Sequence, residues 1–416
     1  MKIIFRARNT RTTLRYCVSR LSSLLGFNRS LMQTASLQQS ASWCFSSPIG
    51  DRIPDHLNDF AGKLFEGDRR TLSRAITLLE SSHPAHRNEG HYVLSQAMNF
   101  LAEREARSGA LSLRIGISGP PGAGKSTFIE TLGGRLTGTL PWLQDHTVQA
   151  AGDNSQNTKS APINFGKHRV AVLAVDPTSS ATGGSLLADK TRMQELSRDP
   201  RAYIRPSPSG GNLGGVARST NEAVVLCEAA GYDIILVETV GVGQSETAVA
   251  DMVDLFILLI PPAGGDEFQG IKRGIVEYAD IVVVNKADGD LVAPARRIAV
   301  EYSHALRYQR QRRPNWRPLV LLVSSRDGVG LPEFWSKVLE FQAKQLASKQ
   351  LQKIRKQQLT VWMWNYIKEG IWRYFHSHPL ISNEIGKMET KVANGEIAPG
   401  PAAEQLIRTF TRELQG

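Results

Sequence analysis

The stretch Gly119-Pro-Pro-Gly-Ala-Gly-Lys-Ser126 decides the fold of this chain. It fits the pattern G-x-x-x-x-G-K-[ST], and it lies between an apolar run at 112–118 and a segment with helical spacing. Glycines let the backbone turn so that successive N–H groups point at phosphate oxygens, and the start of a helix adds a favourable dipole. Strand, loop and helix in this order predict a P-loop, a phosphate-binding site on an α/β fold.

Individual positions of this loop have distinct expected roles. Lys125 places a positive charge between the β- and γ-phosphates, the Ser126 hydroxyl coordinates Mg²⁺, and Thr127 contacts the α-phosphate. We therefore expect nucleotide to be bound by Gly119, Pro120, Pro121, Gly122, Ala123, Gly124, Lys125, Ser126 and Thr127.

A second motif, Asn285-Lys286-Ala287-Asp288, comes at the end of the apolar run 280–285 and indicates which base is read. The Asp288 carboxylate only accepts hydrogen bonds, and guanine offers N1–H and N2–H together. Adenine has no such pair of donors, so a buried acceptor would stay unpaired. We expect Lys286 to pack on the base and Asn285 to brace the P-loop. The backbone of Ser324, Ser325 and Arg326, after the run 318–324, is expected to contact guanine O6.

Acidic residues at the ends of two other predicted strands are candidate metal ligands. The strand 232–238 ends in Glu238, where many GTPases have Asp, and the N–H of Gly241 can bond the γ-phosphate. Asp176 follows the strand 169–175, and Asp189 comes soon after it. Asp176 could instead cap a turn, and Asp189 could be a solvated loop acid. The predicted metal ligands are Ser126, Asp176, Asp189 and Glu238, and the predicted catalytic residues are Lys125, Asp189, Glu238 and Gly241.

Two polar, glycine-containing segments are candidate switch loops. Residues 178–184 are rich in Ser, Thr and Gly, and we expect γ-phosphate and Mg²⁺ to order them. Residues 210–215 form a second glycine-rich loop that could equally be a flexible connector. Gln244 does not directly follow the glycine at 241, so no residue obviously orients the attacking water, and we expect slow intrinsic hydrolysis.

Composition and charge place the chain among soluble globular proteins. Hydrophobic residues make up 41% and charged residues 21%, and no apolar run approaches the ~20 residues that span a bilayer. Seven of the 50 Lys and Arg residues lie in residues 1–50, which contain no Asp or Glu, so the rest has 43 basic against 39 acidic residues. The net charge of +11 is therefore no argument for nucleic-acid binding. Cys17, Cys44 and Cys227 cannot build a disulfide framework or a thiolate metal site.

The chain divides into four predicted regions. Residues 1–48 alternate Arg with Leu and Val in the manner of a mitochondrial transit peptide, although a disordered basic tail or chloroplast import is also compatible. Residues 51–110 are expected to be helical, with Leu72, Ile76 and Leu79 on one face. Residues 111–345 form a P-loop domain with six expected strands in a mostly parallel sheet: 112–118, 169–175, 232–238, 254–260, 280–285 and 318–324. A polar insertion interrupts it at about 141–168. Residues 346–416 are helical, and their large aromatic residues must pack on this domain or on another subunit.

Several longer runs closely resemble the MeaB/ArgK-type GTPases, the family of the methylmalonic aciduria type A protein. The runs that carry the resemblance are Ala174 to Pro177, Gly183 to Met193, Arg205 to Pro208, Glu238 to Glu246 and Pro261 to Glu267. The resemblance covers about residues 55–416. The insertion at about 141–168 departs from the family, and the basic presequence is absent from bacterial relatives, which favours an organelle.

The resemblance implies a P-loop GTPase with an N-terminal helical extension and a C-terminal helical dimerisation arm. It implies a homodimer that binds GTP, GDP and Mg²⁺ and acts as a chaperone of adenosylcobalamin-dependent methylmalonyl-CoA mutase in the mitochondrial matrix. Cofactor loading and protection of the mutase would be coupled to GTP. By position, Asp176, Asp189 and Glu238 fit the family's Mg²⁺ and switch acids, and residues 266–272 fit its third switch loop.

Three other classes of protein compete with this interpretation. A small-molecule P-loop kinase would tolerate ATP and would need a substrate pocket with a catalytic acid. A GTPase of metallo-enzyme maturation would need a tract rich in His or Cys, whereas the nine His are scattered. A nucleic-acid helix at 349–356 is disfavoured because apolar and aromatic residues surround its Lys and Arg. We expect no nucleic-acid and no membrane partner.

Overall fold

The computed structural model describes residues 55–81, 83–143, 165–175, 193–207, 213–239, 245–262, 273–309 and 311–413. The chain forms two compact units, which divide between residues 373 and 374. The larger unit holds the sheet, and Tyr374 to Glu413 are the described residues of the smaller one. Among the described residues, no helix has the length and apolar character needed to cross a membrane.

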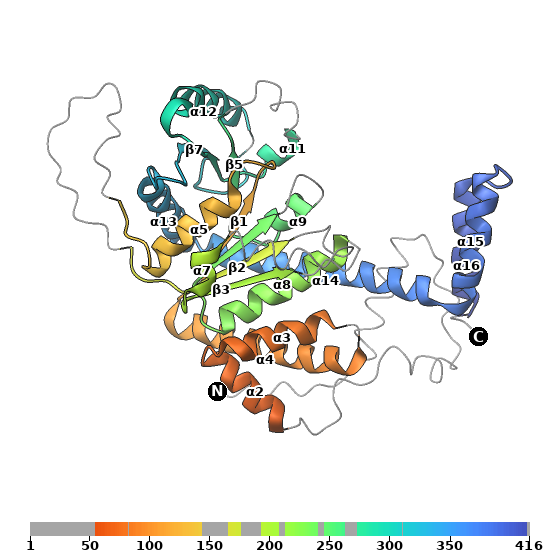
Figure 1. Ribbon diagram of the computed structural model, residues 1–416. Helices are drawn as coiled ribbons and strands as arrows, with labels where there is room; N and C mark the ends of the chain where they lie inside the picture. The colour runs from red at the N-terminus through yellow and green to blue at the C-terminus, as the bar shows by residue number, and fades with distance from the viewer. Residues whose placement is uncertain are drawn as a thin grey trace, which may run out of the picture. The chain divides into compact units, whose positions relative to one another are not determined.

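A parallel sheet of seven strands forms the centre of the larger unit (Figure 1). The strand order is β3-β2-β4-β1-β5-β6-β7, and all neighbouring strands run parallel. β1, β2, β4, β5 and β6 are buried along their whole length, as expected for a sheet covered by helices on both faces. The strands are β1 Leu113–Ser118, β2 Val170–Val175, β3 Ala202–Ser207, β4 Ile234–Thr239, β5 Leu255–Ile260, β6 Ile281–Val284 and β7 Leu319–Leu322.

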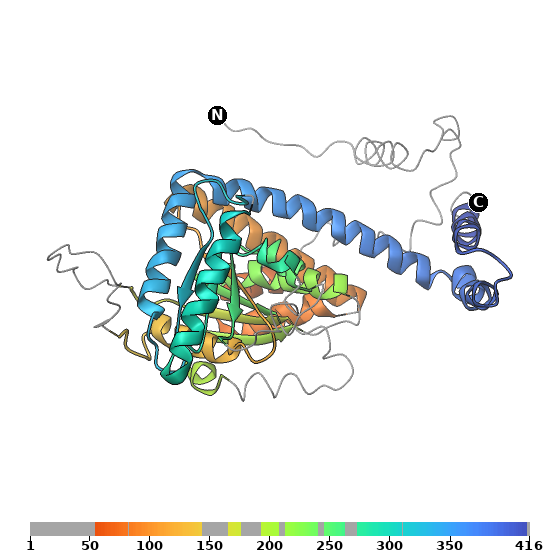
Figure 2. The same cartoon turned by 90° about the horizontal axis from the view of Figure 1, so that it is seen from above.

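Helices cover the two faces of the sheet as two separate hydrophobic cores (Figures 1 and 2). The first core joins α3 Arg69–Glu80, α4 Pro84–Ser108, α8 Leu213–Ala229, α9 Ser245–Ala250 and α12 Val292–Arg307. The second joins α5 Lys125–Thr137, α7 Gln194–Arg198 and α13 Leu331–Ala347. The helices α2 Asp55–Phe65, α11 Arg273–Val276 and α14 Gln350–Ser377 each add a buried side chain to the first core, namely Leu64, Ile275 and Trp362. The other helices are η3 Gly289–Leu291, α15 Pro379–Ala393 and α16 Pro399–Glu413.

The fold class is confirmed, and the strands match the sequence-based prediction with one exception. Six predicted strands are present within two residues of the expected bounds. The one strand that was not predicted is β3, because Arg205 and Pro206 break its apolar pattern. β3 pairs only with β2 at the sheet edge, where a proline is tolerated. The Arg205 side chain forms a half-buried ion pair with Glu80 of α3, so its charge is neutralised.

The N-terminal helices pack on the sheet through the apolar face expected for this region. Leu72, Ile76 and Leu79 of α3 are buried in the first core. Asp68, the residue before α3, caps the helix: its carboxylate accepts the Thr71 N–H at 2.8 Å. The helix α4 contacts α2, α3 and α8, so the three N-terminal helices extend the same layer as α8.

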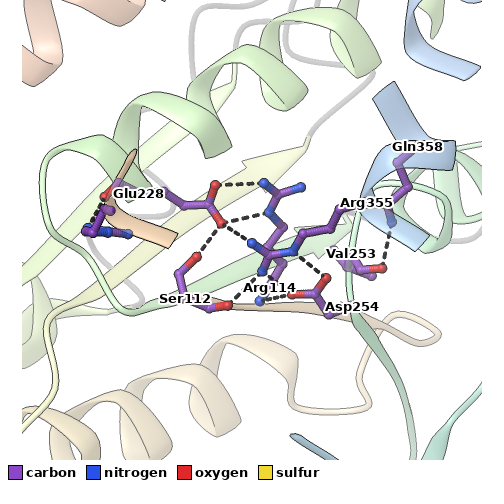
Figure 3. A network of polar contacts seen from close by, with 8 residues as sticks. Ser112, Arg114, Glu228, Val253, Asp254, Arg355 and Gln358 are labelled. Carbon is purple, nitrogen blue, oxygen red and sulfur yellow. Dashed lines mark hydrogen bonds and ion pairs between the residues drawn. The ribbon is translucent and has the colours of Figure 1, made fainter. Parts of the chain in front are cut away.

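A buried ionic network fixes the first half of α14 to the sheet (Figure 3). Arg355 of α14 pairs with Asp254, the residue before β5, and the Nη1 atom of Arg355 lies 3.4 Å from the Glu228 carboxylate. Arg114 of β1 binds Glu228 with two nitrogens, at 2.8 and 2.7 Å. Burial by itself would raise the pKa of Glu228, but the attraction of Arg114 and Arg355 outweighs it and lowers that pKa to about 2.

The aromatic residues of α14 differ widely in their exposure. Trp362 is buried in the first core, and Tyr366 packs partly against it. Trp372 is 57% exposed and Ile371 is 50% exposed. The P-loop domain therefore buries part of the aromatic residues of α14, which is one of the two places where they were expected to pack. Ile371 and Trp372, further along the helix in the larger unit, remain exposed apolar surface.

Candidate functional site

The predicted nucleotide-binding motifs meet at one edge of the sheet. In a parallel sheet, the carboxyl ends of all strands lie along the same edge, and ligands bind there. β1 leads into the P-loop, β4 ends beside Glu238, β6 leads to Asn285, and β7 leads to Ser324. Because β4, β1, β5, β6 and β7 are consecutive in the sheet, these groups form one row.

Two glycines of the P-loop are required by close contacts of its backbone. At Gly119, a Cβ atom would lie 2.1 Å from the carbonyl oxygen of Leu259 in β5. At Gly124, with φ of +84°, it would lie 2.6 Å from Nδ2 of Asn285. Any side chain at either position would push the loop away from its supports, so the sequence pattern has a direct steric cause.

Lys125 and the first turn of α5 point their hydrogen-bond donors toward the loop. The Lys125 ammonium donates to the carbonyl oxygens of Gly119 at 2.7 Å and Pro120 at 3.2 Å, so it lies across the P-loop. α5 is held by Phe128, Ile129 and Leu132, which are buried in the second core. The helix begins at Lys125, and the N–H groups of its first turn have no partner within the helix, which suits an anion.

Ser126 and Glu238 supply neighbouring oxygen ligands. The Ser126 hydroxyl donates to Oε1 of Glu238 at 3.3 Å, although the two residues are 112 positions apart. Glu238 is 4% exposed, at the end of β4. A hydroxyl and a carboxylate side by side are hard oxygen donors of the kind Mg²⁺ prefers, so this pair fits a magnesium ion. The predicted residues Asp176, Asp189 and Gly241 lie outside the described residues, as do the segments 178–184 and 266–272.

Two residues that the sequence analysis missed connect the ends of β1 and β4. The Thr239 hydroxyl donates to Oγ of Ser118 at 2.9 Å, and both side chains are fully buried. Ser118 directly precedes Gly119, and Thr239 directly follows Glu238. The bond therefore sets the start of the P-loop relative to the acid. The sequence shows only that a residue with a hydroxyl group adjoins each motif, and this does not reveal that the two hydroxyls bond to each other.

Asn285 connects the P-loop to the loop after β7. Its Nδ2 donates to the carbonyl oxygen of Ala123 at 2.8 Å. Its Oδ1 accepts from the hydroxyl of Ser325 at 2.6 Å and from the Ser325 N–H at 3.1 Å. The side chain is fully buried, so one amide group joins three segments. The expected bracing role of Asn285 has a geometric basis here.

The other base-reading candidates lie beside Asn285. The hydroxyl of Ser324 donates to Oδ2 of Asp288 at 2.7 Å, which holds the half-buried carboxylate in place. Lys286 is exposed and has φ of +56°, a conformation that turns the chain sharply after β6. The Arg326 side chain is 85% exposed and lies 3.9 Å from Asp327. This arrangement suits the backbone role predicted for Arg326 better than a side-chain role.

The single described cysteine takes no part in this site. Cys227 lies in α8, and burial raises the pKa of its thiol above the ordinary range. In the part of the chain that the structure describes, no three His, Cys, Asp or Glu residues are grouped to hold a metal ion.

Comparison with known proteins gives one family for most of the chain. The family model described as "Methylmalonyl Co-A mutase-associated GTPase MeaB" matches residues 72–139 and 160–379. The stretch that the model leaves unmatched, 140–159, overlaps the polar insertion predicted at about 141–168.

Curated relatives and a solved structure agree with that match. The mitochondrial methylmalonic aciduria type A homolog of Mus musculus is 48% identical over 397 residues, which cover 95% of this chain and 88% of that protein. The homolog of Caenorhabditis elegans is 47% identical over 83% of this chain and 81% of that protein. GTPase ArgK of Escherichia coli is 40% identical over 83% of this chain and 93% of that protein. The structure of a LAO/AO transport system kinase is 32% identical, with a TM-score of 0.63 over 86% of this chain and 99% of that chain.

Proposed function

Because this chain belongs to the MeaB family of methylmalonyl-CoA mutase-associated GTPases, we propose that it uses GTP to assist an adenosylcobalamin-dependent methylmalonyl-CoA mutase. It is a P-loop GTPase, and its family binds GTP and GDP. In the proposed role it is a chaperone that couples GTP binding and hydrolysis to cofactor loading and to protection or reactivation of the mutase. The observation that most supports nucleotide binding is that the P-loop and the base-reading motifs lie along one edge of the sheet. Asn285 links them through its hydrogen bonds to Ala123 and Ser325.

The phosphates of the nucleotide would be held by the P-loop and the start of α5. The N–H groups of residues 119–127 surround the anion, and Lys125 balances the charge of the β- and γ-phosphates. Ser126 and Glu238 would hold Mg²⁺, with Asp176 and Asp189 as further proposed ligands. When bound, Mg²⁺ neutralises the charge that develops on the phosphate oxygens. Lys125, Asp189, Glu238 and the Gly241 N–H are the proposed catalytic groups.

The base would be selected by hydrogen-bond complementarity. Asp288, oriented by Ser324, accepts from guanine N1–H and N2–H, and Lys286 covers the base plane. Backbone groups of Ser324, Ser325 and Arg326 are proposed to contact O6. Hydrolysis is proposed to be slow by itself, since no water-orienting residue directly follows Gly241. A slow intrinsic rate suits a switch whose partner controls its turnover.

Location and assembly are further parts of the proposal. Two relatives that are 47% or more identical are named mitochondrial, and residues 1–48 carry the acid-free basic pattern of a transit peptide. We place the protein in the mitochondrial matrix. The proposed regions are the helical extension 51–110, the GTPase domain 111–345 with its insertion at about 141–168, and the arm 346–416. The arm is proposed to form a homodimer, a role supported by the exposed apolar residues of α14.

The chaperone role is tested by measuring GTP hydrolysis with and without the mutase. The full chain is mixed with adenosylcobalamin-dependent methylmalonyl-CoA mutase, and phosphate release and co-elution are followed with GDP and with the GTP analogue GMPPNP. We expect the mutase to raise the hydrolysis rate and the complex to depend on the nucleotide. Lys125→Ala is the inactive control. If the mutase changes neither the rate nor the elution in any nucleotide state, the chaperone proposal is wrong.

A further inference from the structure

The strand β7 ends the sheet and leaves one side of its main chain unpaired. It pairs only with β6, and α12 packs beside it (Figure 1). The Val323 N–H donates across to the Val284 carbonyl at 2.9 Å. Since successive residues of a strand direct their main-chain groups to opposite sides, the N–H and carbonyl of Val320 point away from β6. Among the described residues, no turn or loop bonds to these two groups. They can therefore pair with an added strand.

A pocket of about 690 Å³ opens beside this edge, between α12 and the start of β7. We call it the α12-side pocket. Its lining includes Arg307 of α12, Arg317 and Val320, but no Asp or Glu. Both arginines are exposed, and neither forms an ion pair or a hydrogen bond with any other described residue. The lining of this pocket thus has a positive charge that none of its own residues offsets.

A second pocket, of about 670 Å³, adjoins the same strand on the side of α13. This α13-side pocket shares Arg317 and Leu319 with the first. Its one acid, Glu340, is held by Lys337 at 2.9 Å and by Lys344 at 2.6 Å. The acid is therefore already neutralised, and the two pockets together remain basic.

The two pockets lie on opposite faces of the sheet edge. Successive side chains of β7 show this, because Leu319 packs against the second core, which includes α13, and Val320 packs against the first, which includes α12. A strand added to β7 would also point successive side chains to opposite faces. Every second side chain of such a strand would enter the α12-side pocket, and the others would face the α13-side pocket. Main-chain pairing together with pockets for alternate side chains is how sheet edges recognise peptides.

The charge of this edge selects the kind of strand that can be added. Unpaired arginines at a sheet edge disfavour pairing with a second copy of the same edge, whereas they attract carboxylates. Exposed large side chains surround the α12-side pocket: Tyr308, which follows Arg307, is 90% exposed, and Val300 of α12 is 56% exposed. Tyrosine and arginine are enriched at protein interfaces. A nucleic acid fits less well, since its phosphates cannot donate to the Val320 carbonyl.

We propose that the open edge of β7 binds an extended acidic segment of another protein by strand addition. The main chain of the segment pairs with Val320, and its acidic side chains bind Arg307 and Arg317 in the α12-side pocket. This inference does not depend on the proposed function, because neither pocket contains a residue of the nucleotide site.

Two hexapeptides of opposite charge test the choice of partner. One alternates glutamate with valine and the other alternates lysine with valine, and each carries a fluorophore for anisotropy titration with the full chain. The glutamate peptide should bind at least about tenfold more tightly. Equal affinity of the two peptides, or no binding of the glutamate peptide at millimolar concentration, would overturn the proposal. Tighter binding of a short oligouridylate than of the glutamate peptide would instead assign the surface to nucleic acid.

Methylation of the peptide nitrogens tests strand addition itself. One version of the glutamate peptide carries N-methyl groups on its glutamates and the other on its valines. Because only one side of an added strand faces β7, one version should lose about fivefold in affinity and the other should not. If both versions bind as tightly as the unmethylated peptide, the main chain is not paired and strand addition is wrong.

Charge reversal assigns the binding to this edge. The double variant Arg307→Glu, Arg317→Glu should bind the glutamate peptide about tenfold more weakly. Arg297→Glu, at an exposed position of α12 outside the pocket lining, is the matched control and should stay within about twofold of the unchanged protein. GDP affinity, unchanged in both, shows that the variants are folded. A double variant that binds the glutamate peptide as tightly as the unchanged protein would exclude this site.

Discussion

The Asn285 side chain connects the phosphate loop to the base-reading loops through a single buried amide. Both of its polar atoms are used, one on Ala123 and one on Ser325. The neighbouring Gly124 approaches it so closely that a Cβ there would overlap the amide nitrogen. Nucleotide affinity should therefore depend on this residue even though its role is to position other groups.

Asn285→Ala should weaken the binding of GDP and GMPPNP alike, by about 10- to 100-fold. Its loss leaves the Ala123 carbonyl and the Ser325 donors without their partner, which also lowers the free energy of unfolding by about 1–3 kcal/mol. Calorimetry and urea unfolding measure the two effects. A variant with full nucleotide affinity would show that the bracing does not matter for binding.

The bond between Thr239 and Ser118 is a second positioning contact, beside Glu238. Thr239→Val should cost about 1–2 kcal/mol of unfolding free energy and slow GTP hydrolysis, since the acid and the P-loop lose their connection. Thr239→Ser keeps the hydroxyl and serves as the matched control, with hydrolysis close to that of the unchanged protein. Equal hydrolysis rates in both variants would rule out the positioning role.

Among the structural elements, the strands with uniform apolar character could be predicted from the sequence, and β3 could not. Runs such as Leu255–Ile260 are buried on both faces, so their composition alone identifies them. In β3, Arg205 is neutralised by Glu80, which lies 125 residues earlier in the chain. No local pattern contains that information. The P-loop and the motif at 285–288 were recognisable for the opposite reason, because their chemistry is contained in consecutive residues.

The docking of α14 also depends on contacts that are distant in sequence. Arg355 reaches Asp254 and Glu228, and Arg114 shares Glu228 with it. The sequence showed a helix with basic and aromatic residues, but not that Arg355 would be buried. Two guanidinium groups facing two carboxylates balance their charges, so removing one member leaves an uncompensated buried charge.

Glu228→Gln should lower the free energy of unfolding by about 3–5 kcal/mol at pH 7. The folded-state pKa of Glu228, about 2, lies below its ordinary value of 4.5. Its ionised form therefore stabilises the fold above pH 4.5, and this contribution is lost as the pH falls from 4.5 toward 2. Urea unfolding should show the difference between variant and unchanged protein shrinking over that range. Glu103→Gln, in an exposed pair with Arg107, should change stability by less than about 1 kcal/mol. A pH-independent difference for Glu228→Gln would contradict the ionic explanation.

For the whole molecule, the apolar surface left on α14 bears on assembly. Val361, Ile371 and Trp372 are 45%, 50% and 57% exposed. Large exposed apolar side chains on one helix are typical of surfaces that contact another protein. This observation supports the proposed homodimer.

Ile371→Glu should convert the proposed homodimer to a monomer, because a charge would be buried at the proposed interface. Light scattering after size-exclusion chromatography gives the mass directly. Lys368→Glu changes the charge at an exposed position of the same helix and should leave the dimer intact. If the unchanged protein already has the mass of a monomer, the proposed assembly is wrong.

The measurement that tests the central claim most directly is nucleotide binding by calorimetry on the full chain with Mg²⁺. GDP, GMPPNP and ADP are compared in the unchanged protein, in Asp288→Ala and in the control Asp290→Ala, an exposed acid two residues further on. We predict that GDP and GMPPNP bind, that ADP does not, and that Asp288→Ala alone weakens binding by about a hundredfold or more. ADP binding that equals GDP binding and is unaffected by Asp288→Ala would contradict guanine recognition at this site.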